Sequence, residues 1–216
     1  MNSPTELCKI ALHHGCLKSN LYKKYNNFVH CHHYTRKYHT IFKHMRHEKF
    51  NLLEIGIGNP QLNNFNHLYK TNTRKIGANL FMWRDYFKHA HIFGIDINNN
   101  NIIHNHKRIS CLQSNQVDSK KINKYLINKS FNIIIDDGSS VPYHQIQTFN
   151  NLIHKLNKGG FYIIENIYVG NHGTNPLNYI KNSIHIKNYH KIEFYFEPKG
   201  YTNSAIIIIH DTRPLL

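Results

Sequence analysis

The chain has 216 residues, and its 27 Lys and Arg residues outnumber its 12 Asp and Glu residues, which gives a formal net charge of +15. Because 40% of the residues are hydrophobic and 12% are aromatic, the composition excludes an intrinsically disordered protein. The longest apolar run, at 205–209, is far shorter than the roughly 20 residues that cross a bilayer. Residues 1–6 are polar and lack the apolar core of a signal peptide. We therefore expect a soluble, cytoplasmic protein with no membrane partner.

The first fifty residues are predicted to form a basic N-terminal helical cap, separate from a domain at 51–216. Apolar residues recur there every three or four positions: Tyr38, Ile41, Phe42 and Met45. This spacing predicts a helix within 35–49. The histidines around Cys31 lack the regular spacing of zinc ligands, so we interpret them as a solvated basic surface. The four cysteines contain no C-x-x-C pair, which favours free thiols.

From residue 51 onward, short β-type runs alternate with amphipathic segments. The predicted strands are 51–55, 91–97, 109–112, 131–135, 161–165, 191–196 and 205–210, and the predicted helices include 78–87 and 143–156. We expect Lys158-Gly159-Gly160 to end the second of these helices and to lead into the fifth strand. The pattern predicts an α/β fold with a mostly parallel sheet, closed at its edge by an antiparallel pair. The long polar segment 59–77 is predicted to be a functional loop.

Nearly half of the acidic residues are predicted to lie at one edge of this sheet. They are Glu54, Asp96, Asp136, Asp137 and Glu165, at or near the carboxyl ends of four predicted strands. Ligands bind at this edge in open α/β sheets, because the loops diverge there. For any single one of these residues, capping of the following helix is the alternative interpretation.

Two of these strand ends are typical of a nucleoside site. After Glu54, Gly56 and Gly58 give the backbone the conformational freedom to approach a ligand closely, but no phosphate-holding helix follows directly. Asp96 ends the next strand, where a carboxylate is placed to accept hydrogen bonds from two ribose hydroxyls. The pair favours a nucleoside cofactor without pyrophosphate, and S-adenosylmethionine fits that description.

The fourth and fifth predicted strands end in residues suited to a hard cation. Asp136 and Asp137 close the fourth strand, and Glu165 and Asn166 close the fifth. Carboxylates on neighbouring strand ends either raise one another's pKa or share a cation, and ligand sets of oxygen alone suit Mg²⁺. The alternative is that Asp136 and Asp137 are a helix cap and a turn residue.

Six segments in chain order resemble the motifs of class I S-adenosylmethionine-dependent methyltransferases. They are 52–58, 77–87, 94–97, 115–116, 134–139 and 159–165. The Trp-Arg-Asp-Tyr-Phe at 83–87 and the Asp-Asp-Gly-Ser at 136–139 resemble the branch of metal-dependent macrolide-sugar O-methyltransferases of the mycinamicin type, together with proteins described as cephalosporin hydroxylase-like. The resemblance implies a Rossmann-like sheet of seven strands, and O-methylation of a sugar or glycan-type small molecule with S-adenosylmethionine and Mg²⁺ or another hard divalent metal.

Carried over position by position, the resemblance also implies the site residues. The implied cofactor-binding residues are Glu54, Gly56, Gly58, Arg84, Asp96, Asn115, Gln116 and Asp136, and the implied metal ligands are Asp137, Glu165 and Asn166. Asn166 stands where the family has an Asp, and Ser140 stands where the family has its general-base His. Because a serine cannot take up the proton of a hydroxyl near neutral pH, His144, one helical turn later, is the candidate base beside Asp137.

Several alternatives stay open at this point. With Ser140 in place of a histidine, three alternatives remain: an active enzyme with His144 or a metal-bound hydroxyl group as its base, a weakly active enzyme, or a cofactor-binding protein that has lost catalysis. The net charge also allows an RNA methyltransferase or a nucleic-acid binder. Basic residues and tyrosines interleave in one stretch that could meet phosphates and stack on bases: Tyr22, Lys23, Lys24, Tyr25, Tyr34, Arg36, Lys37, Tyr38, Lys43 and Arg46. A sugar, nucleotide-sugar or glycan acceptor is preferred, and an oligomer is possible.

Overall fold

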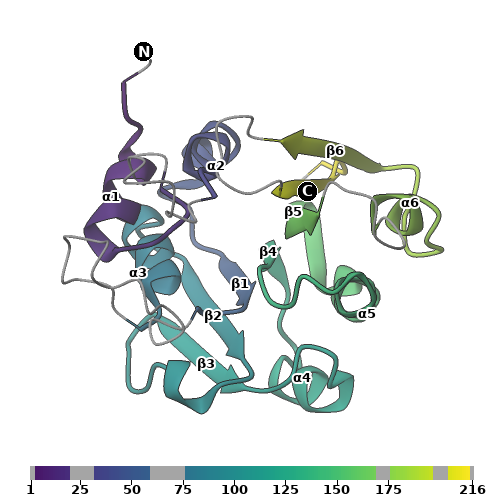
Figure 1. Ribbon diagram of the computed structural model, residues 1–216, viewed down its shortest axis with the longest axis horizontal. Helices are drawn as coiled ribbons and strands as arrows, with labels where there is room; N and C mark the ends of the chain where they lie inside the picture. The colour runs from purple at the N-terminus through teal and green to yellow at the C-terminus, as the bar shows by residue number, and fades with distance from the viewer. Residues whose placement is uncertain (1–2, 20–31, 59–75, 169–175, 197–203, 215–216) are drawn as a thin grey trace.

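Seven strands form one sheet in the order β3-β2-β1-β4-β5-β7-β6 in the computed structural model, which describes residues 3–19, 32–58, 76–168, 176–196 and 204–214 (Figure 1). The strands are β1 (Asn51–Ile55), β2 (His91–Asp96), β3 (Ile109–Gln113), β4 (Phe131–Asp136), β5 (Leu156–Tyr168), β6 (His190–Phe196) and β7 (Ser204–Asp211). The first five strands run parallel, and β7 is antiparallel to both β5 and β6. The predicted α/β class and the antiparallel closing strand are confirmed.

Helices cover both faces of the sheet. The helices are α1 (Glu6–His14), α2 (Thr35–Phe42), α3 (Ala78–Tyr86), α4 (Ser119–Tyr125), α5 (Pro142–Leu152) and α6 (Pro176–Lys181), with 3₁₀ turns at Lys43–Met45, Asn99–Asn101 and Ile153–Lys155. Apolar residues of α1, α2 and α3 pack in one cluster on one face, and those of α4, α5 and α6 pack in a second cluster on the other. None of the helices in the described ranges is long and apolar enough to cross a membrane.

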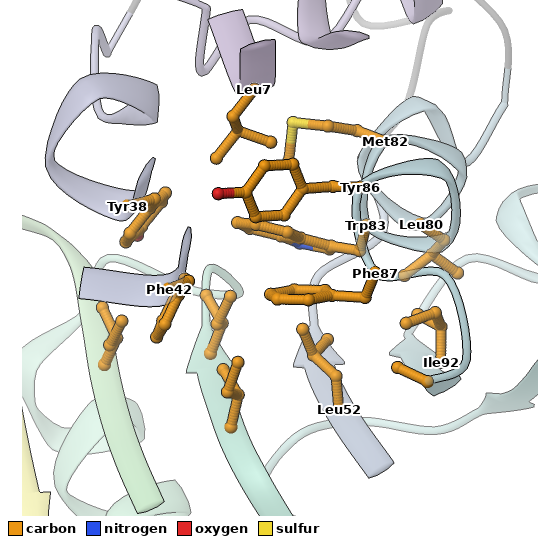
Figure 2. Packing of buried hydrophobic residues seen from close by; sticks show 14 of the residues in the cluster. Leu7, Tyr38, Phe42, Leu52, Leu80, Met82, Trp83, Tyr86, Phe87 and Ile92 are labelled. Atoms are coloured by element: carbon orange, nitrogen blue, oxygen red, sulfur yellow. The ribbon is translucent and has the colours of Figure 1, made fainter. Parts of the chain in front are cut away.

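The N-terminal helices belong to the same core as the sheet (Figure 2). Tyr38 and Phe42 of α2 pack against Trp83 of α3, with ring centroids 5.5 and 6.2 Å apart, and Trp83 stacks on Phe87 at 5.8 Å. Such aromatic pairs add about 0.5–1.5 kcal/mol each beyond the area that they bury. The packing therefore holds α1 and α2 against α3 and the sheet.

Two predicted boundaries are wrong. The helix expected within 35–49 ends at Phe42 and continues only as a 3₁₀ turn. The Lys158-Gly159-Gly160 segment does not end α5, because α5 ends at Leu152 and β5 already begins at Leu156. The register against β4 shifts here, so the glycines lie in a bulge, and the positive φ of Gly159, 71°, suits that distortion. Residues 59–75 of the predicted loop lie outside the described residues.

Candidate functional site

The carboxyl edge of the sheet brings the predicted acidic residues together. Ile55 at the end of β1 pairs with Ile95 of β2 and with Asp136 of β4, so these strands end side by side. β5 pairs with β4 through Ile164 and Asp136 and then continues, which places Glu165 just beyond the end of β4. Parallel pairing thus gathers residues that are up to 111 positions apart, from Glu54 to Glu165, on one edge.

Gly56 is required by the close approach of two chain segments. Its amide donates a hydrogen bond to the carbonyl of Ile95 at 2.8 Å, its φ is +85°, and a Cβ built on it would lie 2.1 Å from the carbonyl oxygen of Asp137. Gly58 also has a positive φ, +88°, but a Cβ there would meet nothing within 4 Å. The first glycine therefore serves the packing of the site, and the second serves the turn.

A cavity of about 550 Å³ opens at this edge, within the size range of cofactor sites. Seven of the predicted site residues line it: Gly56, Gly58, Asp96, Asn115, Gln116, Asp137 and His144. Backbone amides hold Asp96 at its wall, because Ile57 N donates to Oδ2 and Asn98 N donates to Oδ1, both at 2.8 Å. The carboxylate is therefore oriented before any ligand is present.

Gln116 connects the cavity wall to a buried carboxyl group. Its Oε1 accepts a hydrogen bond from the amide of Ser139 at 2.6 Å, and its Nε2 donates to Thr148 at 2.9 Å and to Asp136 at 3.3 Å. Burial raises the pKa of Asp136 to about 8, although the amide of Gly138 opposes the shift by donating a hydrogen bond. Asp136 lies beneath the cavity and does not line it.

Arg84 lies away from the cavity. Its Nε donates to Oδ1 of Asp85 at 2.7 Å, and its guanidinium stacks over the ring of Phe81 at 4.9 Å. Asp85 also bonds to Nε2 of His14 at 2.7 Å, so this pair of α3 residues fastens α1 to the core. The structure does not bring Arg84 together with the other residues predicted to bind the cofactor.

Beside the cavity, three carboxylates enclose the side chain of Lys18. Lys18 Nζ lies 2.5 Å from Oδ2 of Asp137, 2.7 Å from both carboxylate oxygens of Glu165 and 3.4 Å from Oε1 of Glu54. Burial alone would lower the pKa of Lys18, but these carboxylates raise it well above its ordinary value. Burial also raises the pKa of Glu54 and of Glu165, and Lys18 opposes both shifts. We refer to these four residues as the Lys18 cluster.

Asn166 joins the Lys18 cluster through a bulge in β5. The register against β7 shifts between Ile164 and Ile167, and Asn166 takes a φ of 58°, a conformation that Asn tolerates better than most residues. Its Nδ2 donates a hydrogen bond to Oδ1 of Asp137 at 2.7 Å. The predicted metal ligands Asp137, Glu165 and Asn166 therefore lie together.

The donor chemistry of these three residues fits a hard divalent cation. All three offer oxygen, and Oδ1 of Asn166 is a buried acceptor without a hydrogen-bond partner among the described residues. Within those same ranges, no group of three His, Cys, Asp or Glu side chains is arranged around an open metal position. At this site, Lys18 Nζ stands where the carboxylates converge.

The sequence does not reveal the contacts that several further residues make with the site. Tyr38 donates a hydrogen bond from its hydroxyl to Oε1 of Glu165 at 2.6 Å, and Asn79 donates to Oε1 of Glu54 at 3.2 Å. The thiol of Cys16 donates a hydrogen bond to Oδ1 of Asn79 at 2.9 Å. Burial raises the pKa of this thiol to about 12, which keeps it unreactive. The apolar spacing marks Tyr38 as a core residue but does not reveal its hydroxyl contact.

His144 lies on the first turn of α5, which begins at Pro142, so it does not share a helical face with Ser140, which precedes the helix. Its Nδ1 is 2.9 Å from the hydroxyl of Ser139, and it lines the same cavity as Asp137. Ser140 is half-buried.

Of the tyrosines in the possible nucleic-acid surface, the two that the structure describes are unsuited to stacking on bases. Tyr34 and Tyr38 are fully buried, and Lys37 forms an ion pair with Glu193. Tyr22, Lys23, Lys24 and Tyr25 lie outside the described residues.

Comparisons with known proteins give relatives and a fold. No protein-family model matches the chain. The 8-demethyl-8-(2-methoxy-alpha-L-rhamnosyl)-tetracenomycin-C 3'-O-methyltransferase of Streptomyces olivaceus is 32% identical over 166 residues, which are 76% of this chain and 37% of that protein. Mycinamicin VI 2''-O-methyltransferase of Micromonospora griseorubida is 30% identical over 63% of this chain and 32% of its own length. The chain thus spans about a third of the length of these curated relatives.

Among solved structures, the MycE methyltransferase from the mycinamycin biosynthetic pathway, in complex with Mg, SAH and mycinamycin VI, superimposes with a TM-score of 0.68 at 22% identity. The superposition covers 97% of this chain and 56% of MycE. The expected resemblance is therefore confirmed in fold and in sequence: the chain belongs to the class I methyltransferases and is related over most of its length to the sugar O-methyltransferases.

Proposed function

We propose that this chain transfers the methyl group of S-adenosylmethionine to a hydroxyl group of a sugar on a small molecule, with the help of a divalent cation. The observation that supports the proposal is the cavity lined by Gly56, Asp96 and Asp137, because a nucleoside bound beside Asp96 would lie next to a set of oxygen donors. The names of the relatives, which are sugar O-methyltransferases, support the acceptor class. A nucleotide-linked sugar or a glycan would suit the basic surface equally.

The cavity walls would divide the cofactor between them. Gly56 and Gly58 would lie along the methionine and ribose side, Asp96 would accept hydrogen bonds from the ribose hydroxyls, and Asn115 with Gln116 would flank the adenine. Gln116 would present the Ser139 backbone to this pocket through its 2.6 Å hydrogen bond. S-adenosylmethionine would supply an activated methyl group on a sulfonium.

The residues beside the cofactor would prepare the acceptor. Asp137, Glu165 and Asn166 would hold a divalent cation, which would orient neighbouring sugar hydroxyls and lower the pKa of one of them. In the tautomer that carries hydrogen on Nδ1, His144 donates to the hydroxyl of Ser139, which leaves Nε2 to accept the proton of the acceptor.

One alternative function keeps a specific observation in its favour. A cofactor-binding protein without catalysis would retain the 550 Å³ cavity, while Ser140 would leave the family's base position without a base. The two functions differ in one measurable property, which is the transfer of a methyl group in the presence of a divalent cation.

The test combines cofactor binding with methyl transfer. S-adenosylhomocysteine binding would be measured by calorimetry, and transfer from radiolabelled S-adenosylmethionine would be measured on simple glycosides, nucleotide sugars and mixed RNA, with Mg²⁺ or with EDTA. We expect transfer to a sugar that depends on Mg²⁺ and disappears in Asp137→Asn. The matched control Asp118→Asn keeps a helix-capping side chain at the start of α4 and should behave as the unaltered protein. Binding without transfer to any sugar would favour the non-catalytic alternative.

A further inference from the structure

Lys18 holds the point at which the predicted metal ligands converge. Its ammonium group contacts Asp137 at 2.5 Å and Glu165 at 2.7 Å, and only 2% of its side chain is exposed. Lysine is almost never buried to this extent unless it is paired. The three carboxylates of the Lys18 cluster, two of them fully buried, would repel one another without a cation between them.

The backbone at Lys18 is fixed by contacts from two helices. The amide of Thr35, the first residue of α2, donates to the Lys18 carbonyl at 3.1 Å, and the hydroxyl of Ser19 donates to the carbonyl of Cys8 in α1 at 2.8 Å. Because α1 and α2 are both anchored in the core, the side chain of Lys18 is aimed at the carboxylates by the fold itself.

A metal ion and the Lys18 ammonium would need the same oxygen atoms. Both oxygens of Glu165 lie within hydrogen-bond distance of Lys18 Nζ, and Oε1 also accepts from Tyr38. At Asp137, Oδ2 is taken by Lys18 and Oδ1 by Asn166. An ion coordinated by these oxygen atoms would therefore lie close to the present position of Lys18 Nζ. Because two positive charges repel strongly at such a short distance, the ion and the ammonium group cannot occupy this position together.

A second cavity beside the Lys18 cluster offers the side chain another position. It has a volume of about 200 Å³, and Lys18 and Asp137 both line it, together with Cys16, Gly58 and Asn79. The flexible four-carbon stem of a lysine can rotate into such a space while its backbone stays fixed.

We propose that Lys18 is a tethered cation of the metal site: it neutralises the carboxylates when no metal is bound, and a divalent ion enters only when the Lys18 side chain moves out toward the neighbouring cavity. The inference rests on the cation site of the proposed function. It adds that metal affinity is set by competition with a residue of the protein's own N-terminal segment.

The test measures metal binding without measuring methyl transfer. Mn²⁺ would be titrated into the metal-free protein, and the free ion would be followed by electron paramagnetic resonance. We expect Lys18→Ala to bind one Mn²⁺ about 10-fold to 100-fold more tightly than the unaltered chain, because a competing charge within a few ångströms is gone. Adding Asp137→Asn to this variant should remove the gained site. The control Lys37→Ala, which loses a surface ion pair with Glu193, should leave Mn²⁺ binding unchanged.

Equal or weaker binding by Lys18→Ala would overturn the proposal. If that variant does not fold, labelling of the unaltered chain decides. An amine-reactive reagent should leave Lys18 unmodified in the metal-free protein and modify it at saturating Mn²⁺, while Lys88, which is exposed, reacts in both states. A saturated protein in which Lys18 stays protected would also overturn it. Because no activity is measured, an inactive protein would contradict the proposed function and leave this test intact.

Discussion

The hydroxyl of Tyr38 donates a hydrogen bond to Oε1 of Glu165 at 2.6 Å, and both side chains are fully buried. Burial raises the pKa of this phenol well above its ordinary value, and the neighbouring carboxylate raises it further, so the hydroxyl remains a donor. The same ring packs against Trp83 in the core. One residue of the N-terminal segment thus connects the aromatic core to a candidate metal ligand.

Replacing this tyrosine should cost stability. We expect Tyr38→Phe to lower the free energy of unfolding by about 1–3 kcal/mol, because a buried carboxylate loses a donor while the ring is retained. Tyr162→Phe is the matched control: its hydroxyl is buried without a hydrogen-bond partner among the described residues, so its loss should be neutral or stabilising. Urea unfolding of the three proteins measures the difference, and equal losses in both variants would contradict the assignment.

The two glycines of the first turn should respond very differently to alanine. In Gly56→Ala the new Cβ meets the backbone of Asp137 at 2.1 Å, which no side-chain rotation can relieve, so we expect loss of S-adenosylhomocysteine binding and at least about 3 kcal/mol of stability. Gly58 also has a positive φ, but a Cβ at this position would meet open space. Gly58→Ala should therefore lower the free energy of unfolding by only about 1 kcal/mol. Calorimetric binding and thermal unfolding of both variants test this contrast.

Glu165 lies outside the 550 Å³ cavity, which separates its role from cofactor binding. Glu165→Gln should therefore keep its affinity for S-adenosylhomocysteine within a few-fold, while Mg²⁺-dependent methyl transfer falls by about 10²-fold or more. An unchanged transfer rate would remove Glu165 from the candidate metal site.

His144 is predicted to act as the general base. His144→Ala should lower the maximal rate of transfer by about 10²-fold or more, because no other histidine of the described residues lines the cavity to accept the proton of the acceptor hydroxyl. Because His144 also lines the cofactor cavity, S-adenosylhomocysteine affinity is measured beside the rate. A loss of only a few-fold would assign His144 a structural role.

His210 gives a prediction about stability and pH. Its ring stacks on Phe161 with centroids 4.2 Å apart, and burial lowers its pKa below the ordinary value of 6.5, with Asp211 opposing the shift. The unfolded chain therefore binds a proton at His210 more readily than the folded protein does. The stability that the neutral His210 ring contributes to the folded protein is lost as the pH falls below about 6.5. His210→Phe removes the titrating group. The stability of the unaltered chain relative to this variant should fall between pH 7 and pH 5, and a constant difference would contradict the shift.

The sequence was sufficient for the sheet and for the position of its ligand-binding edge. The strand ends at Gly56, Asp96 and Asp137 could be predicted because each combines a β-type run with a residue that the turn requires. The beginning of β5 could not, because Gly159 resembles a helix stop and its role in a bulge depends on pairing with β4. Local patterns do not record pairing between distant segments.

The contacts that complete the site were hidden for a similar reason. Lys18 is one of 27 basic residues, and nothing local distinguishes it from those on the surface. Its neighbours Asp137 and Glu165 are 119 and 147 positions away, so only the folded chain shows the ion pairs. Arg84 is the opposite case, because its motif predicts a cofactor contact and the folded chain directs it to Asp85.

Glu165 and Lys18, which form an ion pair in the Lys18 cluster, lie in segments that should open at different free-energy costs. Glu165 directly follows Ile164 of β5, which is paired on both sides, with Asp136 of β4 and with Ile207 of β7, so the paired part of this strand should open only when the whole domain unfolds. Lys18 lies between α1 and α2, outside any strand, and hydrogen bonds such as the one from the Thr35 amide hold it there, so a local opening of this part of the chain can release it while the sheet stays paired. The carboxylate of Glu165 is thus held as firmly as the sheet itself, whereas the ammonium group of Lys18 can be released at a smaller free-energy cost.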